Sequence, residues 1–280
     1  MADITWKNLN ELASFKKLEN VSPVSLKKVL GSENGPSRVS KFNIKMGGGL
    51  TYNYAAKAVS DESLAVLADL AKEAQLVEKY EELYNGAVVN TGENRLVLHQ
   101  LTRGQLGKDV IVDGVNKRDF YIEQQKKIAD FAQKVHSGKI VNEKGEKYTT
   151  VCQIGIGGSD LGPRAMYLAL ENWAKTNGEL RMEAKFISNV DPDDAAAVLK
   201  STDVSRAIFI LVSKSGTTLE TLTNEAFVKD ALAKAGLDAG KHMIAVTSET
   251  SPLAKSSNYL AAFFMDDYIG GRYSSTSAVG

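Results

Sequence analysis

One short segment of the chain gathers hydroxyl groups beside a lysine and a glycine. It reads Ser213-Lys214-Ser215-Gly216-Thr217-Thr218 and directly follows an apolar run. Hydroxyl groups, and the free N–H groups at the start of a helix, can hold phosphate oxygens, and Lys214 adds a mobile positive charge. Any one serine or threonine is more simply interpreted as a helix cap. Because four of them (Ser213, Ser215, Thr217 and Thr218) flank a lysine and a glycine, we favour anion binding.

A second candidate anion site lies at Gly155-Ile-Gly-Gly-Ser-Asp-Leu-Gly-Pro163. A β-rich run over 151–156 leads into this glycine turn, and a helical pattern follows it. Glycine permits a close approach between backbone and ligand, and a helix N-terminus attracts anions. Two such turns in one α/β region predict that the ligand is a phosphorylated small molecule. Gly158 and Ser159 are the candidate contacts in this turn.

The same glycine turn could also belong to a dinucleotide-binding enzyme. The fingerprint Gly-x-Gly-x-x-Gly fails at its third glycine, where Asp160 stands, and no convincing acidic residue follows about 20 residues later. A carboxylate at this turn would oppose a pyrophosphate, and the Walker A pattern is absent as well. An NAD(P)-dependent oxidoreductase is therefore the least favoured function, and we predict no cofactor.

Three further kinds of side chain could take part in chemistry. Arg272 follows Gly270-Gly271, so its guanidinium could reach into a pocket and stabilise a developing oxyanion; the alternative is a structural ion pair. Glu220 begins a helical pattern, where a glutamate usually complements the helix dipole. The histidines lack metal-ligand spacing, so we interpret them as structural and predict no metal site. They are His99, His136 and His242.

The elements that must position these residues alternate regularly from residue 149 onward. Short β-rich runs are expected at 150–156, 183–190, 206–212, 242–247 and 261–265. Helical patterns fill the gaps at about 160–175, 192–200, 218–235 and 251–258. Apolar strands alternating with helices predict an α/β fold with a doubly wound, mainly parallel, five-stranded sheet that is flanked by helices. Ligands bind such sheets beyond the carboxyl ends of the strands, where both candidate anion loops fall.

The residues before 149 are expected to include a mostly helical N-terminal extension. Helical patterns cover about 60–85 and 119–137, and Gly86 and Gly138 act as stop signals. Residues 86–118 mix short strands and turns. We therefore divide the chain into an N-terminal extension, 1–118, that packs on the core, and an α/β domain, 119–280, that binds the phosphorylated ligand.

Composition limits the classes of protein. The chain has 280 residues and equal numbers of basic and acidic side chains, 34 of each, which argues against a nucleic-acid-binding surface. No apolar run approaches the roughly 20 residues that span a bilayer. The single cysteine, Cys152, lies in an expected buried strand and is interpreted as an inert core thiol. We expect a cytoplasmic protein with no membrane partner.

At this point the motifs match a known family. The chain resembles glucose-6-phosphate isomerases (phosphoglucose isomerases). The matching motifs are Gly155-Ile-Gly-Gly-Ser-Asp-Leu-Gly-Pro163, Ser213-Lys-Ser-Gly-Thr-Thr-Leu-Glu-Thr221 and Asp267-Tyr-Ile-Gly-Gly-Arg-Tyr-Ser-Ser-Thr-Ser-Ala-Val-Gly280. The segment from Asn90-Thr-Gly-Glu-Asn-Arg95 through Leu98-His99 also looks like the family's N-terminal part.

The resemblance implies a sugar-isomerase (SIS) domain and the interconversion of glucose 6-phosphate and fructose 6-phosphate through a cis-enediolate, in glycolysis and gluconeogenesis. It implies that Arg272 stabilises the enediolate, that Gly271 adds a backbone contact, and that Glu220 matches a family glutamate near the site. Arg272, Lys214 and Glu220 are therefore the candidate catalytic residues. The loop hydroxyls would hold the phosphate with Lys214 beside it, while Gly158 and Ser159 would contact the sugar. It also implies a homodimer with sites shared between subunits.

Family members are much longer than this chain, and no residue here matches their proton-transfer glutamate, ring-opening histidine or late lysine. We therefore expect that the family's second SIS domain is missing, and that this chain carries the phosphate-binding half and is inactive alone. The alternative is a non-catalytic phosphosugar-binding module of the same fold.

Overall fold

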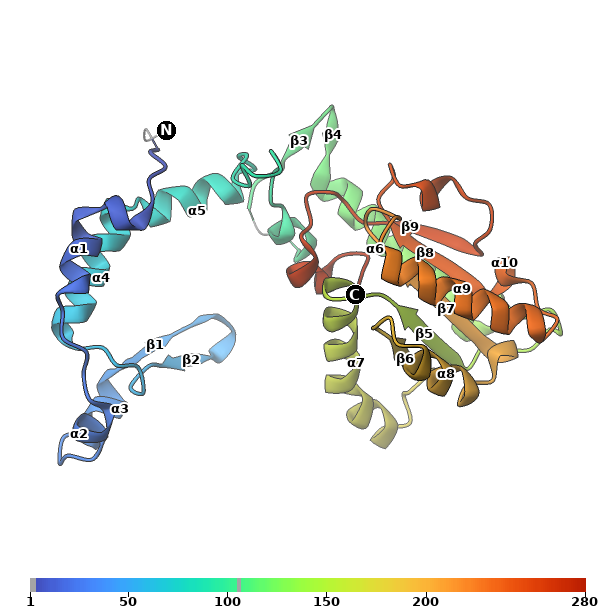
Figure 1. Ribbon diagram of the computed structural model, residues 1–280, viewed down its shortest axis with the longest axis horizontal. Coiled ribbons are helices and arrows are strands. Elements are labelled where there is room, and N and C mark those ends of the chain that lie inside the picture. Colours follow the sequence, from blue (N-terminus) through green and yellow to red (C-terminus); the bar gives the residue numbers. More distant parts are fainter. Residues whose placement is uncertain (1–3, 105–106) are drawn as a thin grey trace. The chain divides into compact units, whose positions relative to one another are not determined.

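The structure is a computed structural model that describes residues 4–104 and 107–280. It contains two compact units, Met1–Glu82 and Leu83–Gly280, and each is described by itself (Figure 1). The functional division expected between residues 118 and 119 stays a prediction.

The first unit is largely helical, as expected, and also holds a β-hairpin. Its α-helices are α1 (Ala13–Glu19), α2 (Leu26–Leu30), α3 (Gly35–Lys41) and α4 (Asp61–Glu73), and α5 (Leu76–Tyr84) begins in it. The hairpin joins β1 (Asn43–Lys45) to β2 (Thr51–Asn53) in antiparallel register. Short 3₁₀ helices are η1 (Leu9–Glu11) and η2 (Gly47–Gly49).

The single helix expected over 60–85 is wrong, because it is broken between α4 and α5. Gln75 lies at the break with a φ of 53°, outside the helical region. Its side-chain oxygen accepts a hydrogen bond from the Thr5 N–H at 2.9 Å. The break is therefore accompanied by a contact 70 residues away in sequence, which helical periodicity does not encode.

The second unit is built on a five-stranded sheet in which every neighbouring pair is parallel. Its strands are β5 (Thr150–Ile154), β6 (Glu183–Ile187), β7 (Ala207–Val212), β8 (Met243–Thr247) and β9 (Ala261–Phe264). They lie in the order β6-β5-β7-β8-β9. This order confirms the expected doubly wound parallel sheet.

Helices connect these strands and cover both faces of the sheet (Figure 1). The helices are α6 (Lys117–Ser137), α7 (Gly158–Thr176), α8 (Pro192–Lys200), α9 (Leu219–Lys234) and the short α10 (Ala239–His242). Alternate side chains of β7 enter different apolar clusters: Phe209 packs with Val228 of α9, and Ile208 packs with Val135 of α6. Because successive side chains of a strand point to opposite faces, α9 and α6 lie on opposite sides of the sheet.

Smaller elements surround the sheet. A 3₁₀ helix, η3 (His99–Thr102), and a two-stranded ladder of β3 (Ile111–Val112) and β4 (Val115–Asn116) precede α6. Further 3₁₀ helices are η4 (Val204–Arg206), η5 (Pro252–Lys255) and η6 (Gly271–Thr276). The helix expected over 251–258 is therefore wrong in type and length: only η5 forms there.

Helix ends follow their sequence signals. The Asp191 side chain accepts hydrogen bonds from the N–H groups of Asp193 and Asp194, so it caps α8 ahead of Pro192. Gly138 ends α6 with a φ of 79°, a conformation that glycine adopts without strain. Within the described part of the chain, no helix is long and apolar enough to cross a membrane.

Candidate functional site

The strand order places the two candidate anion loops next to each other. From β5 the chain moves to β6 on one side, and it then returns to β7 on the other side. Connections that leave in opposite directions open a crevice beyond the carboxyl ends of the two adjacent strands. The Gly155–Pro163 motif follows β5 and the Ser213–Thr218 loop follows β7, so both segments lie at this crevice.

Ser213 organises the loop after β7. It is buried, with 2% of its surface exposed. Its hydroxyl accepts from the Gly216 N–H at 3.1 Å and donates to Thr218 Oγ1 at 3.1 Å. The Thr247 hydroxyl donates to the Ser213 carbonyl at 2.7 Å, which fastens the loop to the end of β8. Ser213 thus shapes the loop.

Gly216 is required by the loop's conformation. Its φ is 68°, and a β-carbon at this position would lie 2.2 Å from Ser251 Oγ. Any other residue type would take a strained φ here and would displace the Ser251 hydroxyl, which accepts from the Leu253 N–H in the segment after β8.

The exposed donors of this loop are Ser215 and Thr217. The Ser215 hydroxyl accepts from the Thr217 N–H at 3.2 Å and from its hydroxyl at 3.0 Å, so the two side chains lie together. Thr218 is the N-cap residue of α9, and its side chain makes no capping hydrogen bond. The first-turn N–H groups of α9 therefore face the loop without a side-chain cap, an arrangement suited to an anion.

Three glycines of the Gly155–Pro163 motif serve close packing, while Gly157 has a φ of 57° and open space around it. A β-carbon on Gly155 would lie 2.6 Å from the Ser159 carbonyl oxygen, and one on Gly158 would lie 2.2 Å from the Gly271 carbonyl carbon. One on Gly162 would lie 2.8 Å from the Ser275 β-carbon. The motif thus brings the start of α7 against η6, the segment that carries Arg272.

Pro163 and Gln153 together position Ser159. Proline has no N–H, so Pro163 cannot bond the Ser159 carbonyl within α7. The Gln153 side chain reaches across from β5 and donates to this carbonyl at 2.6 Å. The N-terminal turn of α7 is thereby fastened to the sheet at the candidate sugar contact.

The negative charge of Asp160 is paired with Arg164 inside the protein. It is buried, with 6% of its surface exposed, and Arg164 contacts its Oδ1 through Nε at 3.0 Å and through Nη2 at 2.9 Å. The carboxylate is therefore held by α7 itself.

Arg272 lies in η6 with an exposed side chain. Its side chain has no hydrogen bond or ion pair with any residue in 4–104 or 107–280, so the structural ion pair considered for it does not form there. Lys214 is half-buried, and its Nζ donates to the Asp267 carbonyl at 3.4 Å. This bond joins the loop after β7 to the segment that leads into η6, so all three motifs meet at one edge of the sheet.

The remaining predicted residue, Glu220, lies in the first turn of α9 with an exposed side chain. Within the described ranges it forms no ion pair or hydrogen bond through its carboxylate. Its negative charge complements the helix dipole. The structure thus leaves it free at the edge of the loop.

Sequence patterns indicated only a structural role for His99, and the structure places it beside this site. Its Nε2 lies 2.9 Å from the Gly270 carbonyl oxygen. Burial and the positive charges of Arg103 and Lys214 lower the pKa of His99, against the opposing effect of the Gly270 bond. Only the family likeness of the segment around Leu98-His99 pointed toward this region.

The other two histidines lie away from the site. His242 is fully buried, and its ring nitrogens contact the Ala207 carbonyl at 2.8 Å and Glu143 Oε2 at 2.9 Å. His136 lies in the last turn of α6. Among the residues that the structure describes, no group of three or more His, Cys, Asp or Glu side chains could hold a metal ion.

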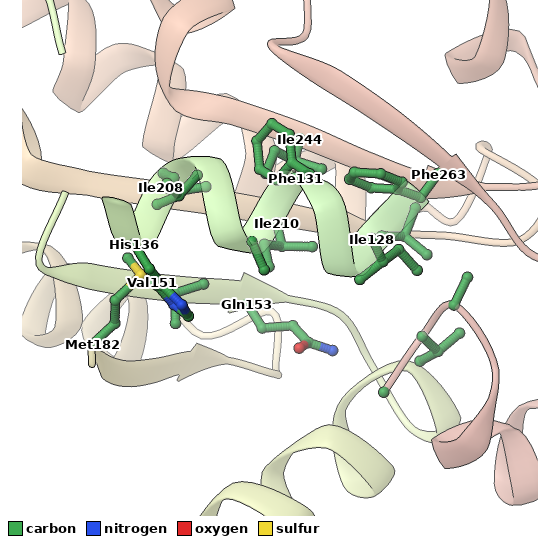
Figure 2. A pocket seen from close by; sticks show the side chains of 16 residues that line it. Ile128, Phe131, His136, Val151, Gln153, Met182, Ile208, Ile210, Ile244 and Phe263 are labelled. Atoms are coloured by element: carbon green, nitrogen blue, oxygen red, sulfur yellow. The ribbon is translucent and has the colours of Figure 1, made fainter. Parts of the chain in front are cut away.

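An apolar cavity of about 250 Å³ lies between α6 and the sheet, apart from these loops. Figure 2 shows Ile128 and Phe131 of α6 facing Ile210 and Ile244 of the sheet across it. None of the predicted site residues lines this cavity. Its lining is mostly apolar, with Gln153 and His136 as polar members, and offers no cluster of cations or hydroxyl groups for a sugar phosphate.

Comparisons with known proteins agree with these motifs. The sequence model of the phosphoglucose isomerase family matches residues 53–280. A glucose-6-phosphate isomerase of Treponema denticola is 59% identical, over 98% of this chain and 53% of that protein. One from Treponema pallidum is 51% identical, over 99% of this chain and 52% of that protein.

A solved structure is also similar. The crystal structure of a glucose-6-phosphate isomerase from Chlamydia trachomatis superposes with a TM-score of 0.82 at 34% identity, covering 98% of this chain and 52% of that one. The chain spans about half the length of the relatives it matches. Its sequence and its fold together place this chain in the phosphoglucose isomerase family.

Proposed function

We propose that this chain binds the phosphate group of glucose 6-phosphate and fructose 6-phosphate and carries that half of an aldose–ketose isomerase. The observation that supports this most is the meeting of the three motifs at the strand-order switch. There the exposed hydroxyls of Ser215 and Thr217, the start of α9 and Lys214 form an anion cradle. Ser213 and Thr218 hold the cradle in shape.

The reacting end of the sugar would lie toward α7 and η6. Gly158 and Ser159 would contact the sugar there, and Gly271 would add a backbone contact. When a base removes the C2 proton of the open-chain aldose, negative charge develops on the oxygens of a cis-enediolate. The proton returns at C1, and the hydroxyl proton moves from O2 to O1, to give the ketose. Arg272, which has no partner among the described residues, would stabilise that charge.

Proton transfer needs a base within hydrogen-bond reach of the C1 and C2 protons. The exposed Glu220 has the right chemistry, but we assign it a place near the phosphate because it begins the helix at the phosphate loop. We therefore propose that the chain binds substrate but does not isomerise it alone. A cytoplasmic location, a homodimer, and a role in glycolysis and gluconeogenesis belong to this proposal through the family.

Hydrogen exchange at C1 of fructose 6-phosphate in D₂O tests this assignment. We expect no exchange above background with the purified chain. We expect exchange to appear on addition of the part of the Treponema denticola relative that lies outside the match. Exchange by the chain alone would contradict the proposal that it binds substrate without isomerising it. Phosphosugar binding without exchange in the mixture would favour the non-catalytic binding module.

A further inference from the structure

A segment far upstream in the sequence holds both sides of the Arg272 turn. We call residues 98–103 the clamp. The Leu98 N–H donates to the Tyr268 carbonyl at 3.1 Å, and His99 Nε2 contacts the Gly270 carbonyl at 2.9 Å. These bonds fix the backbone immediately before Gly271 and Arg272.

The other end of the clamp fixes the backbone after Arg272. The hydroxyls of Thr102 and Thr276 lie 2.7 Å apart, and Arg103 donates to the Tyr273 carbonyl at 3.4 Å and to Thr276 Oγ1 at 3.3 Å. Thr102 also donates to the His99 carbonyl at 2.8 Å, which ties the two ends of the clamp together. The chain is thus held on both sides of Arg272, whose own side chain is exposed.

The proton on His99 follows from its partner. A carbonyl oxygen can only accept, so Nε2 must carry the proton that it shares with Gly270. Burial lowers the pKa of His99, and the charges of Arg103 and Lys214 lower it as well, against the opposing effect of the Gly270 bond, so the neutral form of the ring is favoured. The side chain therefore holds the turn without adding positive charge beside Arg272.

We propose that His99 is a positioning residue for Arg272, which it aims at the reacting carbons of the sugar by holding the Gly270 carbonyl. This inference rests on the proposed function. A group fixed in advance loses little freedom when charge develops, so its contact with an enediolate is stronger than that of a mobile side chain. The phosphate cradle lies on another loop, whose Lys214 bonds the Asp267 carbonyl and not that of Gly270.

Two ligands distinguish binding at the phosphate cradle from binding at Arg272. Inorganic phosphate probes the cradle alone, and 5-phosphoarabinonate adds a carboxylate that mimics the enediolate. In the 280-residue chain, we expect His99→Leu to weaken 5-phosphoarabinonate binding about tenfold, on the scale of one lost hydrogen bond, and to leave phosphate binding unchanged. His99→Gln, which keeps an N–H donor at a similar reach, should recover most of the loss. His136→Leu removes an exposed histidine elsewhere and should have no effect.

A double-mutant cycle tests the route through Arg272. If His99 acts through Arg272, His99→Leu has no further effect in an Arg272→Ala background. Equal losses in both backgrounds, or a loss of phosphate affinity to the same degree, would overturn the positioning role. A wild-type chain that is folded and binds neither ligand would overturn the proposed function itself, and the positioning role with it.

A second variant keeps the test independent of the folding of His99→Leu. Thr102→Val removes the hydroxyl that joins Thr276 to the His99 carbonyl with little change in volume. We expect a smaller loss in the same direction, selective for 5-phosphoarabinonate. Wild-type affinity in Thr102→Val together with wild-type affinity in every folded His99 variant would contradict the clamp.

Discussion

Gly158 and Gly271 pack backbone against backbone, so closely that a β-carbon on Gly158 would lie 2.2 Å from the Gly271 carbonyl carbon. This contact joins the turn after β5 to the turn that carries Arg272. We expect Gly158→Ala to push these segments apart, to destabilise the protein by about 1–3 kcal/mol, and to abolish phosphosugar binding. Gly47→Ala, at a site where the added carbon meets nothing within 4 Å, is the matched control. Urea unfolding and titration of both variants check this, and wild-type binding by Gly158→Ala would contradict it.

The hydroxyls of the phosphate loop should fall into two classes, one that stabilises the loop and one that binds the ligand. Ser213→Ala should lower the free energy of unfolding by about 1 kcal/mol, because its buried hydroxyl makes two hydrogen bonds inside the loop. Ser215→Ala should leave stability unchanged and weaken phosphate binding by about fivefold to tenfold, because its exposed hydroxyl is available to a ligand. Urea unfolding and calorimetry on the same samples separate the two effects. The reverse assignment would show that Ser213 faces the ligand.

Arg272 should matter for binding and not for stability. It has no partner in the described ranges, so Arg272→Ala should leave the unfolding midpoint unchanged. We expect about a hundredfold loss of affinity for 5-phosphoarabinonate, and Arg272→Lys should recover only part of it because lysine lacks the planar fork. A large loss of stability in Arg272→Ala would indicate a structural role instead.

The sequence predicted the sheet more completely than it predicted the contacts within the site. Near-continuous apolar runs such as 207–212 predicted the five parallel strands, and the helix expected over 192–200 is confirmed as α8. Local pattern could not tell that Ser213 faces inward, since its partner Thr247 comes from another strand. The contact of His99 with Gly270 spans 171 residues and leaves no periodic signal.

Acid should weaken the contact between Glu143 and His242. Burial would raise the pKa of Glu143, but its hydrogen bonds, including that from His242, outweigh this effect and hold the pKa below its usual 4.5. A lowered carboxyl pKa stabilises the fold above pH 4.5, and this stabilisation is lost as the pH falls through the lower folded-state value. Urea unfolding between pH 7 and pH 3 should therefore show a steeper decline for the wild type than for Glu143→Gln. Parallel curves would contradict the prediction.

The single thiol should not react with thiol reagents in the native state. Cys152 is fully buried in β5, and burial raises its pKa to about 12, so almost no thiolate exists at neutral pH. We expect a thiol reagent at pH 8 to label the chain only in denaturant. Rapid labelling of the folded protein would show that β5 opens readily.

Calorimetric titration of the 280-residue chain with fructose 6-phosphate tests the central claim most directly, with NAD as the control ligand. The meeting of the three motifs predicts saturable binding of the sugar phosphate, competition by inorganic phosphate, and no binding of NAD. A folded chain that binds NAD, or that binds no sugar phosphate at all, would contradict the assignment of these loops.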